Sequence, residues 1–554
     1  MKHLTLCFAL IVALFACAPS EDNRPNILLV VADDLAFTDI GVFGGEIHTP
    51  NLDALAASGV RLTQFYVAPT CSPTRSMLLS GTDNHLAGLG NMAEELRENQ
   101  KDNPGYEGYL NFRVEALPEI LLDAGYHTYM AGKWHLGMTK ETSPGARGFE
   151  HYFSLLQGGA GHLDEMPLIG PNPAVYEEDG ERIVLPEDFY SSRTYSEKMI
   201  EYLENRPDDG KPFFAYLTYT APHWPLQAPK ESVAKYAGQY ASGYDALQIS
   251  RFEKMQQIGL ITSGMQVIER LPTEPAWDSL TVEEREFEAR KMEIYAAMVD
   301  DLDRYLGTVL ESLKRNSDFD NTFIIFMSDN GPEGAHLDIG WDVLGKWVEQ
   351  CCNNSLENIG AANSYVWPGP NWSRAVTPPF RMFKGFTTEG GIRSPAIVHF
   401  PGIIPGGTIQ GAMTTVMDVL PTILELAEIE HPSTFKGKET LPLRGASMLS
   451  LLKGESETVH DENYTMGWEL FGRRAVRQGD WKIVWEPSGI PWKPDDPNVI
   501  EDQWRLYNLA TDPGEQIDLA TQEPEKLNDL ITQWESYVME TGFIVPDYEA
   551  GYAQ

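Results

Sequence analysis

Short uninterrupted runs of apolar residues recur along the chain and predict buried strands. The clearest runs cover residues 27–32, 213–219, 323–327 and 396–400, and a further strand-like run covers 127–131. These runs are rich in β-branched and aromatic residues and lack polar alternation, which is typical of parallel strands covered on both faces. We therefore expect a mostly parallel central sheet.

Helical patterns separate these runs. Thr49-Pro50 precedes a helical stretch over 51–58 that Gly59 ends, and Leu117-Pro118 opens another that ends at Gly125. A long amphipathic pattern covers 287–313. Because strands alternate with helices, the pattern predicts an α/β fold in which helices sandwich a large mixed sheet.

The pattern changes after about Leu443. Residues 473–485 contain two strand-like pieces around a Gly-Asp turn, 504–509 resembles another strand, and 523–539 has a helical pattern. These features predict a smaller antiparallel sheet closed by a helix. We therefore expect a catalytic domain over 25–443 and a C-terminal α+β subdomain over 444–554.

Charge composition narrows the choice of partners. The 554 residues include 42 Lys and Arg against 81 Asp and Glu, which gives a net charge of −39. Such an acidic protein repels nucleic acid, so we expect no nucleic-acid partner. A solvated acidic surface accounts for most of this charge.

The first 17 residues are typical of an export signal. Lys2 and His3 precede an apolar run over 4–15 that is too short to span a bilayer. Residues 14–17, Leu-Phe-Ala-Cys, resemble the cleavage box of a bacterial lipoprotein, with Cys17 as the lipidated residue. We expect an exported protein, periplasmic or anchored to the outer membrane of a bacterium through Cys17, with plain secretion as the alternative.

The remaining cysteines raise a question about Cys71. Cys7 and Cys17 belong to the predicted signal, and Cys351 and Cys352 are adjacent, an arrangement expected to be too strained for a mutual disulfide. No disulfide framework is therefore expected. Cys71 is left as a lone thiol in a protein predicted to be exported, which makes it a candidate functional residue.

Polar residues follow four of the predicted strands at their carboxyl ends, where open α/β sheets bind ligands. They are Asp33 and Asp34, Lys133 and His135, His223, and Asp329 and Asn330. We expect them to meet at one edge of the sheet. Asp33, Asp34, Asp329 and Asn330 offer only oxygen ligands, which suits a hard cation such as Ca²⁺ or Mg²⁺. Asn rather than His at position 330 favours a single calcium ion.

The stretch "CSPTRSMLLSG" at 71–81 resembles the signature of the type I sulfatases, C-x-P-x-R followed by a short apolar helix and Gly. Further matches are "VADD" at 31–34, "AGKWHLG" at 131–137, "APHWPLQAP" at 221–229, "MSDNG" at 327–331 and "KGFTTEGGIRSPA" at 384–396. The resemblance extends from about Pro25 to Gly542 and is greatest to soluble bacterial arylsulfatases. It implies an alkaline-phosphatase-like fold.

The resemblance also implies a modified residue at the site. In that family a dedicated maturation enzyme oxidises the cysteine, here Cys71, to Cα-formylglycine. The implied calcium ligands are Asp33, Asp34, Asp329 and Asn330, with the modified Cys71 beside them. Pro73 suits the first turn of a helix, and the N–H groups at such a helix start favour an anion.

By the same resemblance, Arg75 holds the aldehyde hydrate, and Lys133 and Lys384 contact hydrate and sulfate oxygens. After the hydrate attacks sulfur, His223 and Lys384 protonate the departing oxygen, with Lys133, His223 and Lys384 binding substrate. His135 then takes a proton from the second hydroxyl, which expels sulfate.

The expected activity is hydrolysis of small aryl sulfates by a monomeric enzyme. Trp224, Trp367 and Phe386 stand near the motifs and are candidates for an apolar pocket. Alternatives are a sulfatase of sulfated sugars and a phosphodiester or phosphonate monoester hydrolase of the same superfamily. A catalytically inactive surface lipoprotein that binds sulfated ligands is a further alternative, although no catalytic residue is missing.

Overall fold

The computed structural model describes residues 22–262, 264–337, 342–485 and 503–547. The predicted signal over 1–17, including Cys17, lies outside these residues. Within them, no helix combines the length and the apolar character that crossing a membrane requires.

An 11-stranded sheet forms the centre of the molecule, in the order β10-β2-β9-β8-β1-β7-β3-β4-β5-β6, with β11 paired to β2. Four predicted strands lie side by side in it and run parallel, as expected. They are β8 (Thr322–Ser328), β1 (Asn26–Ala32), β7 (Phe213–Thr218) and β3 (His127–Lys133). The neighbouring β4 (His151–Leu155) is also parallel to β3.

The prediction of a parallel strand over 396–400 is wrong in direction. That run belongs to β9 (Arg393–His399), which pairs antiparallel with β8 and with β2 (Val60–Tyr66). Lys384, which precedes β9, contacts Asp34 at the carboxyl end of β1, so β9 enters the sheet from that edge. A run buried on both faces has the same composition in either direction.

Shorter strands complete the sheet. Hairpin strands β5 (Tyr176–Glu178) and β6 (Glu181–Arg182) extend it antiparallel beyond β4. Strands β10 (Thr408–Gln410) and β11 (Thr414–Thr415) pair parallel with β2 at the other side. The sheet is therefore mixed but mostly parallel, as the sequence predicts.

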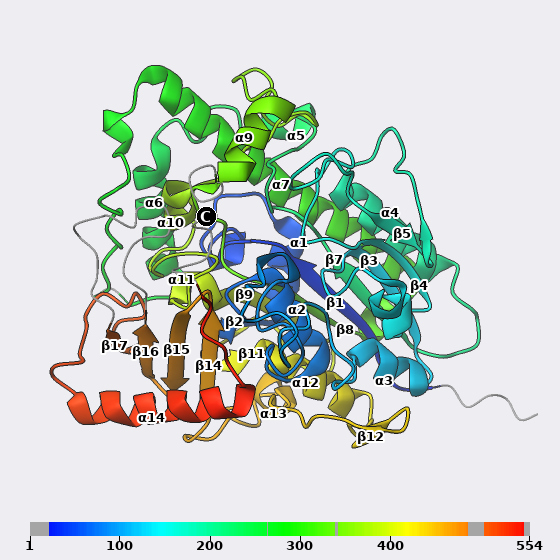
Figure 1. Cartoon of the computed structure of the whole chain (residues 1–554). Helices are drawn as coiled ribbons and strands as arrows, with labels where there is room; N and C mark the ends of the chain where they lie inside the picture. The colour runs from blue at the N-terminus through cyan, green and yellow to red at the C-terminus, as the bar shows by residue number, and fades with distance from the viewer. Residues whose placement is uncertain (1–21, 263, 338–341, 486–502, 548–554) are drawn as a thin grey trace, which may run out of the picture.

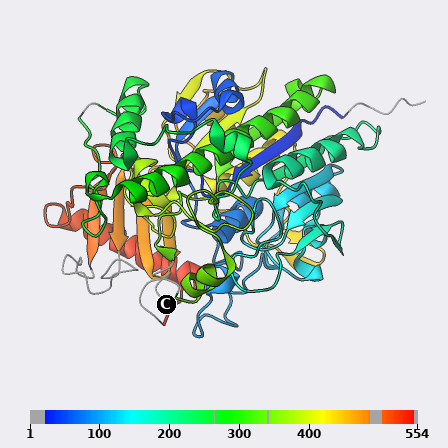
Figure 2. The same cartoon turned by 90° about the horizontal axis from the view of Figure 1, so that it is seen from above.

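Helices cover both faces of the sheet (Figures 1 and 2). In β1, Leu28 and Val30 belong to one buried apolar cluster and Leu29 and Val31 to another, because successive side chains of a strand point to opposite faces. The first cluster includes residues of α1 (Pro50–Ala57), α4 (Ser191–Glu204) and α7 (Val282–Arg315). The second includes residues of α2 (Cys71–Ser80), α3 (Leu117–Asp123) and α12 (Val419–Leu426).

A smaller four-stranded antiparallel sheet follows near the C-terminus and lies at one end of the molecule in both views (Figures 1 and 2). It comprises β14 (Thr465–Leu470), β15 (Arg473–Gln478), β16 (Trp481–Trp485) and β17 (Trp504–Asn508). Helix α14 (Pro524–Thr541) packs on it through Leu530 and Trp534. The predicted antiparallel sheet and helix are confirmed, with β14 as an additional strand.

Further helices and one hairpin lie in the connections between these elements. They are α5 (Lys230–Ala234), α6 (Gly243–Gln257), α9 (Asp342–Cys351), α10 (Pro370–Ala375), α11 (Glu389–Ile392), α13 (Leu449–Leu452), and the hairpin of β12 (Thr434–Phe435) and β13 (Lys438–Glu439).

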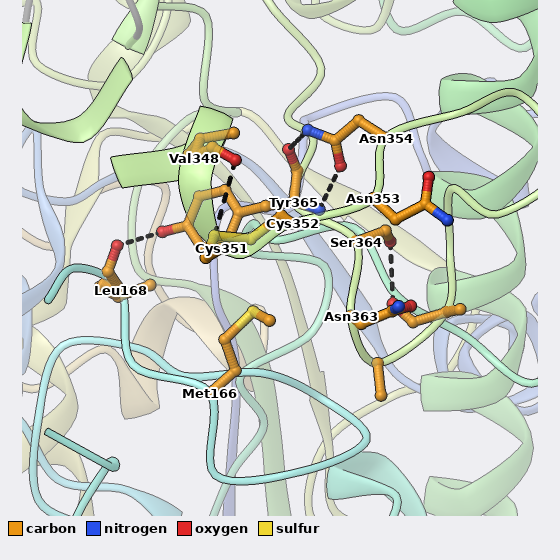
Figure 3. The surroundings of a disulfide bond; sticks show 12 residues. Met166, Leu168, Val348, Cys351, Cys352, Asn353, Asn354, Asn363, Ser364 and Tyr365 are labelled. Carbon is orange, nitrogen blue, oxygen red and sulfur yellow. Dashed lines mark hydrogen bonds between the residues drawn. A yellow bond between two sulfur atoms is a disulfide. The ribbon is translucent and has the colours of Figure 1, made fainter. Parts of the chain in front are cut away.

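A disulfide joins the adjacent Cys351 and Cys352, so the expectation that they stay unpaired is wrong (Figure 3). Within a helix, consecutive side chains point about 100° apart. Helix α9 ends at Cys351, however, and the chain turns there, which allows the two sulfur atoms to meet. Cys71 is the free cysteine of the described part of the chain, as expected.

Candidate active site

The polar residues that follow β1, β8, β3 and β7 converge at one edge of the central sheet. Because these strands are parallel, their carboxyl ends face the same way. One oxygen, sulfur or nitrogen atom from each of Asp33, Asp34, Cys71 and His223 lies within 4.8 Å of the others. All four side chains are buried. The structure thus brings these four side chains together at this edge.

Cys71 is the first residue of α2, which places it beside unpaired helix N–H groups. Its Sγ lies 3.4 Å from Asp33 Oδ1. Pro73 falls in the first turn, and Gly81 ends the helix in a left-handed conformation. Arg75, one turn after Cys71, is fully buried on the same side of the helix.

Two ion pairs are built into the floor of the site. Lys133 Nζ, at the end of β3, donates to Asp33 Oδ1 at 2.9 Å and to Oδ2 at 2.7 Å. Arg75 donates to Asp329 Oδ2 from Nε at 3.0 Å and from Nη2 at 2.7 Å. Its Nη1 also donates to the Lys133 carbonyl oxygen at 3.0 Å. Because all four side chains are fully buried, these pairs hold the charges in fixed positions.

Asp34 is contacted from two sides. Lys384 Nζ lies 2.9 Å from Asp34 Oδ1 and 3.6 Å from Glu333 Oε2. Asn330 Nδ2 donates to Asp34 Oδ1 at 2.7 Å. Asn330 Oδ1 is buried and has no hydrogen-bond partner among the described residues. A buried acceptor without a donor is costly unless a ligand satisfies it.

These residues fit a hard cation. Asp33, Asp34, Asp329 and Asn330 offer carboxylate and amide oxygens, and the unpartnered Asn330 Oδ1 provides the acceptor that a cation would use. Asp329 lies beside the group formed by Asp33, Asp34 and Cys71: its Oδ1 accepts from the Asp34 N–H at 3.3 Å. Its Oδ2 is held by Arg75.

Burial and charge act in opposite directions on the acidic groups. Burial by itself raises the pKa of Asp33, but Lys133 and the other cations nearby lower it overall. Burial raises the pKa of Asp34 more than Lys384 lowers it. Burial also raises the pKa of the Cys71 thiol well above its ordinary value, in spite of Lys133 and Lys384. The thiol is therefore neutral near pH 7.

His223 points its two ring nitrogens at different partners. Nδ1 lies 2.5 Å from the Trp224 carbonyl oxygen, which assigns the proton to Nδ1, and Nε2 lies 3.7 Å from Asp34 Oδ2. Burial, together with the charge of Lys384, lowers the pKa of His223 well below its ordinary value. His162, which the sequence analysis missed, contacts the His223 carbonyl oxygen through Nε2 at 2.8 Å.

His135 follows β3 and is paired with a residue that the sequence analysis also missed. Its Nε2 lies 2.9 Å from Glu94 Oε1, while its Nδ1 is buried without a partner among the described residues. Burial alone raises the pKa of Glu94, but His135 lowers it to about 2. A Cβ at Gly158 would lie 2.6 Å from the His135 ring, so glycine makes room for this pair. Glu94 stands in a three-residue 3-10 helix, Ala93–Glu95, which is too short for a periodic pattern to mark it.

A cavity of about 900 Å³ opens above these groups. Cys71, His135, His223 and Lys384 line its floor. Of the three aromatic residues considered from sequence, Trp224 lines this cavity and Trp367 lines a separate one. Phe386 is buried under the Arg473 guanidinium, 4.0 Å from its ring centre.

The site combines a free cysteine with buried carboxylates and cations, and comparison with known families identifies the class of protein. Residues 25–429 match the model of the Sulfatase family, and 380–540 match that of the N-sulphoglucosamine sulphohydrolase C-terminal region. The first match covers most of the chain. The chain therefore belongs to the sulfatase family and hydrolyses sulfate esters.

Two relatives that are named sulfatases align with most of the chain. An uncharacterised sulfatase of Schizosaccharomyces pombe is 47% identical over 543 residues, covering 95% of this chain and 96% of its own. An arylsulfatase of Klebsiella aerogenes is 37% identical over 436 residues, covering 78% and 93%. The solved structure of Ps i-CgsB in complex with k-i-k-neocarrahexaose is similar in fold, with a TM-score of 0.66, 24% identity and 95% of each chain covered.

Proposed function

We propose that this sulfatase is an arylsulfatase, which converts an aryl sulfate and water to a phenol and sulfate. The nucleophile is made from Cys71, and calcium is the metal. The observation that carries the proposal is the position of Cys71, at the N-terminus of α2 and within 4.8 Å of Asp33, Asp34 and His223. The sulfatase from Klebsiella aerogenes, named an arylsulfatase, supports the substrate class.

The buried cations account for recognition of an anionic group by a protein of net charge −39. Attack on a sulfate ester brings a nucleophile to a group that is already negative, so positive groups must surround its oxygens. Lys133 and Lys384 supply fixed positive charge beside Cys71, and Arg75 adds a third charge behind it. The acidic character of the exterior therefore does not extend to the floor of the cavity.

Asp33, Asp34, Asp329 and Asn330 would hold calcium, which would supply a Lewis acid for one sulfate oxygen. With the ion bound, these oxygen ligands have a common partner. Lys133, Arg75 and Lys384 keep the carboxylates at fixed positions through their own hydrogen bonds.

The neutral state of the Cys71 thiol supports modification of this residue. A thiol whose pKa is raised by burial is a poor nucleophile. The hydrated aldehyde of formylglycine would supply one hydroxyl to attack sulfur and a second to release sulfate afterwards. The proposal therefore includes a maturation enzyme as a partner. It also includes export, directed by residues 1–17 with Cys17 as the site of a lipid anchor.

His223 and Lys384 would protonate the departing phenol oxygen. Because His223 Nδ1 donates to the Trp224 carbonyl oxygen, the transferable proton is at Nε2. The ring is neutral in the free protein, and the negative charge of bound sulfate favours its protonated form. Lys384 Nζ, 3.6 Å from Glu333, is held near the same oxygen.

His135 would act as the base in the second step. Glu94 accepts a hydrogen bond from the Nε2–H group of His135. Nδ1 is therefore the basic atom of the neutral ring. Nδ1 is buried and has no partner among the described residues, so it is available to a hydroxyl on residue 71.

The test begins with a mass spectrum of the peptide that contains residue 71, in protein from a host with the maturation enzyme. We expect the aldehyde in place of the thiol. Initial rates are then compared on nitrophenyl sulfate and on a nitrophenyl phosphate diester. The rates are measured again after a chelator has removed divalent metal, and once more after calcium has been added back. We expect a large preference for the sulfate and loss of activity on chelation; a preference for the diester would contradict the proposal.

A serine at position 71 gives an independent test. Cys71→Ser provides one hydroxyl but not a second one to expel sulfate. We expect it to accumulate a sulfated protein, detected by intact mass, or to show no turnover. Sustained multiple turnovers by this variant would contradict the role assigned to the modified residue.

A further inference from the structure

Three exposed apolar side chains meet at the mouth of the active-site cavity. Met138, Ile169 and Val343 have exposed fractions of 54%, 42% and 70%, and all three line this cavity. They come from the turn after β3, the loop between β4 and β5, and the first turn of α9. Single exposed apolar residues are common, but a group around one opening marks a surface that a ligand covers.

The cavity is larger than a simple aryl group needs. Its volume is about 900 Å³, whereas a cavity of about 150 Å³ is enough to hold benzene. Met92, Leu168 and Trp224 extend the apolar lining from the mouth toward His223. The substrate's apolar part therefore has room to continue well beyond the ring that carries the sulfate.

The charges of the upper cavity disfavour a second sulfate. Above the catalytic groups the charged residues of the lining are Glu94, Glu95 and Arg97, and Arg97 lies 3.3 Å from Glu95. No excess positive charge is therefore present in this described part of the lining. Remote sulfates of a polysulfated chain would meet carboxylates there.

Gln157, Thr139 and Thr142 of the same wall already use polar atoms within the protein. Gln157 Oε1 accepts from the Val175 N–H at 2.7 Å, and the hydroxyls of Thr139 and Thr142 lie 3.1 Å apart. Sugar hydroxyls would therefore find few open partners on this side. An apolar body would not need any.

The loop that carries Ile169 is held in place from below. The Tyr365 hydroxyl donates to the carbonyl oxygen of Leu168, the residue before Ile169 (Figure 3). Asn354 in turn donates to the Tyr365 carbonyl oxygen at 2.9 Å and accepts from its N–H at 2.7 Å. The apolar mouth is thus a preformed surface rather than a loose loop.

We propose that this cavity takes amphiphilic monosulfates, in which the esterified phenol or alcohol carries a long or fused apolar body that covers Met138, Ile169 and Val343. The inference rests on the proposed function and specifies its substrates. Sulfate would sit on the catalytic floor, and the apolar body would fill the upper cavity and its mouth.

The experiment compares phenyl sulfate with 4-octylphenyl sulfate, below the concentration at which the latter forms micelles. The alkyl tail leaves the phenol leaving group almost unchanged, so a difference in kcat/KM reports binding of the tail. Each buried CH₂ contributes about 0.8 kcal/mol, roughly fourfold. We expect kcat/KM to be at least about tenfold higher for the octyl compound, mainly through a lower KM.

Two variants test whether the higher kcat/KM of the octyl compound depends on the apolar residues at the cavity mouth. Val343→Asp and Ile169→Asp should each reduce the ratio of the two kcat/KM values severalfold, because a carboxylate replaces apolar contact with the tail. Val184→Asp is the matched control: Val184 is 87% exposed and does not line the cavity, so both rates should stay unchanged.

The outcomes separate the two proposals. Hydrolysis of both esters with equal kcat/KM would overturn the inference and leave the arylsulfatase proposal intact. Failure of the formylglycine-containing enzyme to hydrolyse either ester would overturn the proposed function itself. A large ratio that neither mouth variant reduces would overturn the assignment of the tail to this surface.

Discussion

Two clusters of buried charge in this protein are similar in composition and differ in how completely they are paired. The site cluster, at the carboxyl edge of the central sheet, contains Asp33, Asp34, Lys133, Asp329 and Lys384. The interface cluster joins the central sheet to the C-terminal sheet and contains Tyr66, Glu389, Lys482 and Glu515. Both groups are almost inaccessible to water.

In the interface cluster the charges are paired with one another. Lys482 Nζ, from β16, lies 2.9 Å from Glu389 Oε1 and 2.8 Å from Glu515 Oε1. The Tyr66 hydroxyl donates to Glu389 Oε2 at 2.7 Å, and the Glu389 N–H donates to Glu515 Oε2 at 2.9 Å. None of these four residues lines the cavity above Cys71.

Next to the site cluster, by contrast, two polar atoms have no protein partner among the described residues. Asn330 Oδ1 and His135 Nδ1 are both buried and unpaired among the described residues, and His135 opens into the cavity. Unsatisfied groups that line or underlie a cavity are retained because a ligand satisfies them. The comparison indicates that one set of charges holds two sheets together, while the other lies beside buried polar atoms that are open to a ligand.

Removing the proposed nucleophile should affect only activity. Cys71→Ala is expected to lower kcat/KM for nitrophenyl sulfate by more than about 10⁴-fold, since the covalent step is lost. The melting temperature should change by only a few degrees, because a small side chain replaces another beside a cavity. Parallel measurement of rates and thermal unfolding checks this; a strongly destabilised Cys71→Ala protein would show that the two clusters are not separable in function.

Removing the central charge of the interface cluster should affect stability instead. Lys482→Met removes the cation that Glu389 and Glu515 share and leaves Glu389 with Arg393 at 3.4 Å, which costs about 3–5 kcal/mol in the free energy of unfolding. Urea unfolding measures this. The control is Lys436→Met, whose partner is Glu119 at 2.9 Å but whose side chain is 65% exposed; its cost should be about 1 kcal/mol or less. Equal effects of both variants would contradict the role of burial.

The buried residue His85, which lies outside both clusters, makes the contact with the C-terminal sheet sensitive to pH. His85 lies 3.1 Å from Asp83 and 3.3 Å from Glu469 of β14. Burial alone lowers the pKa of His85, but these carboxylates raise it to about 9. Because the pKa is higher in the folded state, the stabilisation is fully present below about pH 6.5 and is lost as pH rises through about 9.

The expected contribution of His85 is on the order of 3 kcal/mol at low pH. Thermal unfolding of the unmodified chain and of His85→Gln should differ most near pH 6 and converge toward pH 10. The exposed His151, which pairs with Asp179 at 2.9 Å, gives the control His151→Gln, expected to follow the unmodified chain. Parallel curves for the unmodified chain and His85→Gln across this range would argue against a charged His85.

The smallest effect is expected at the disulfide. Cys351 and Cys352 are neighbours in sequence, so their bond restricts almost no chain in the unfolded state. Cys351→Ser combined with Cys352→Ser should change the free energy of unfolding by less than about 1 kcal/mol, as measured by urea unfolding. A loss of several kcal/mol would show that this bond supports the surrounding packing of Tyr365 and Leu168.

Much of the site could be predicted from local sequence, because its residues directly follow recognisable strands. Asp33 and Asp34 follow β1, and Asp329 follows β8, so the topology of a parallel sheet brings them together. Glu94 and His162 could not be predicted in this way. Glu94 comes from a three-residue 3-10 helix and His162 from an irregular loop, and their contacts with His135 and His223 depend on how these connections fold over the sheet.

By itself, the sequence determined the strand segments, the helix that begins at Cys71, the C-terminal sheet with its helix, and the grouping of charged residues at strand ends. These features depend on local periodicity and on residue chemistry, both of which are visible along the chain. The tertiary structure alone decided the antiparallel direction of β9, the disulfide at the end of α9, the pairing of His135 with Glu94, and the apolar mouth of the cavity. Each of these depends on where the chain returns after a long connection, and that position is set by packing across the whole molecule.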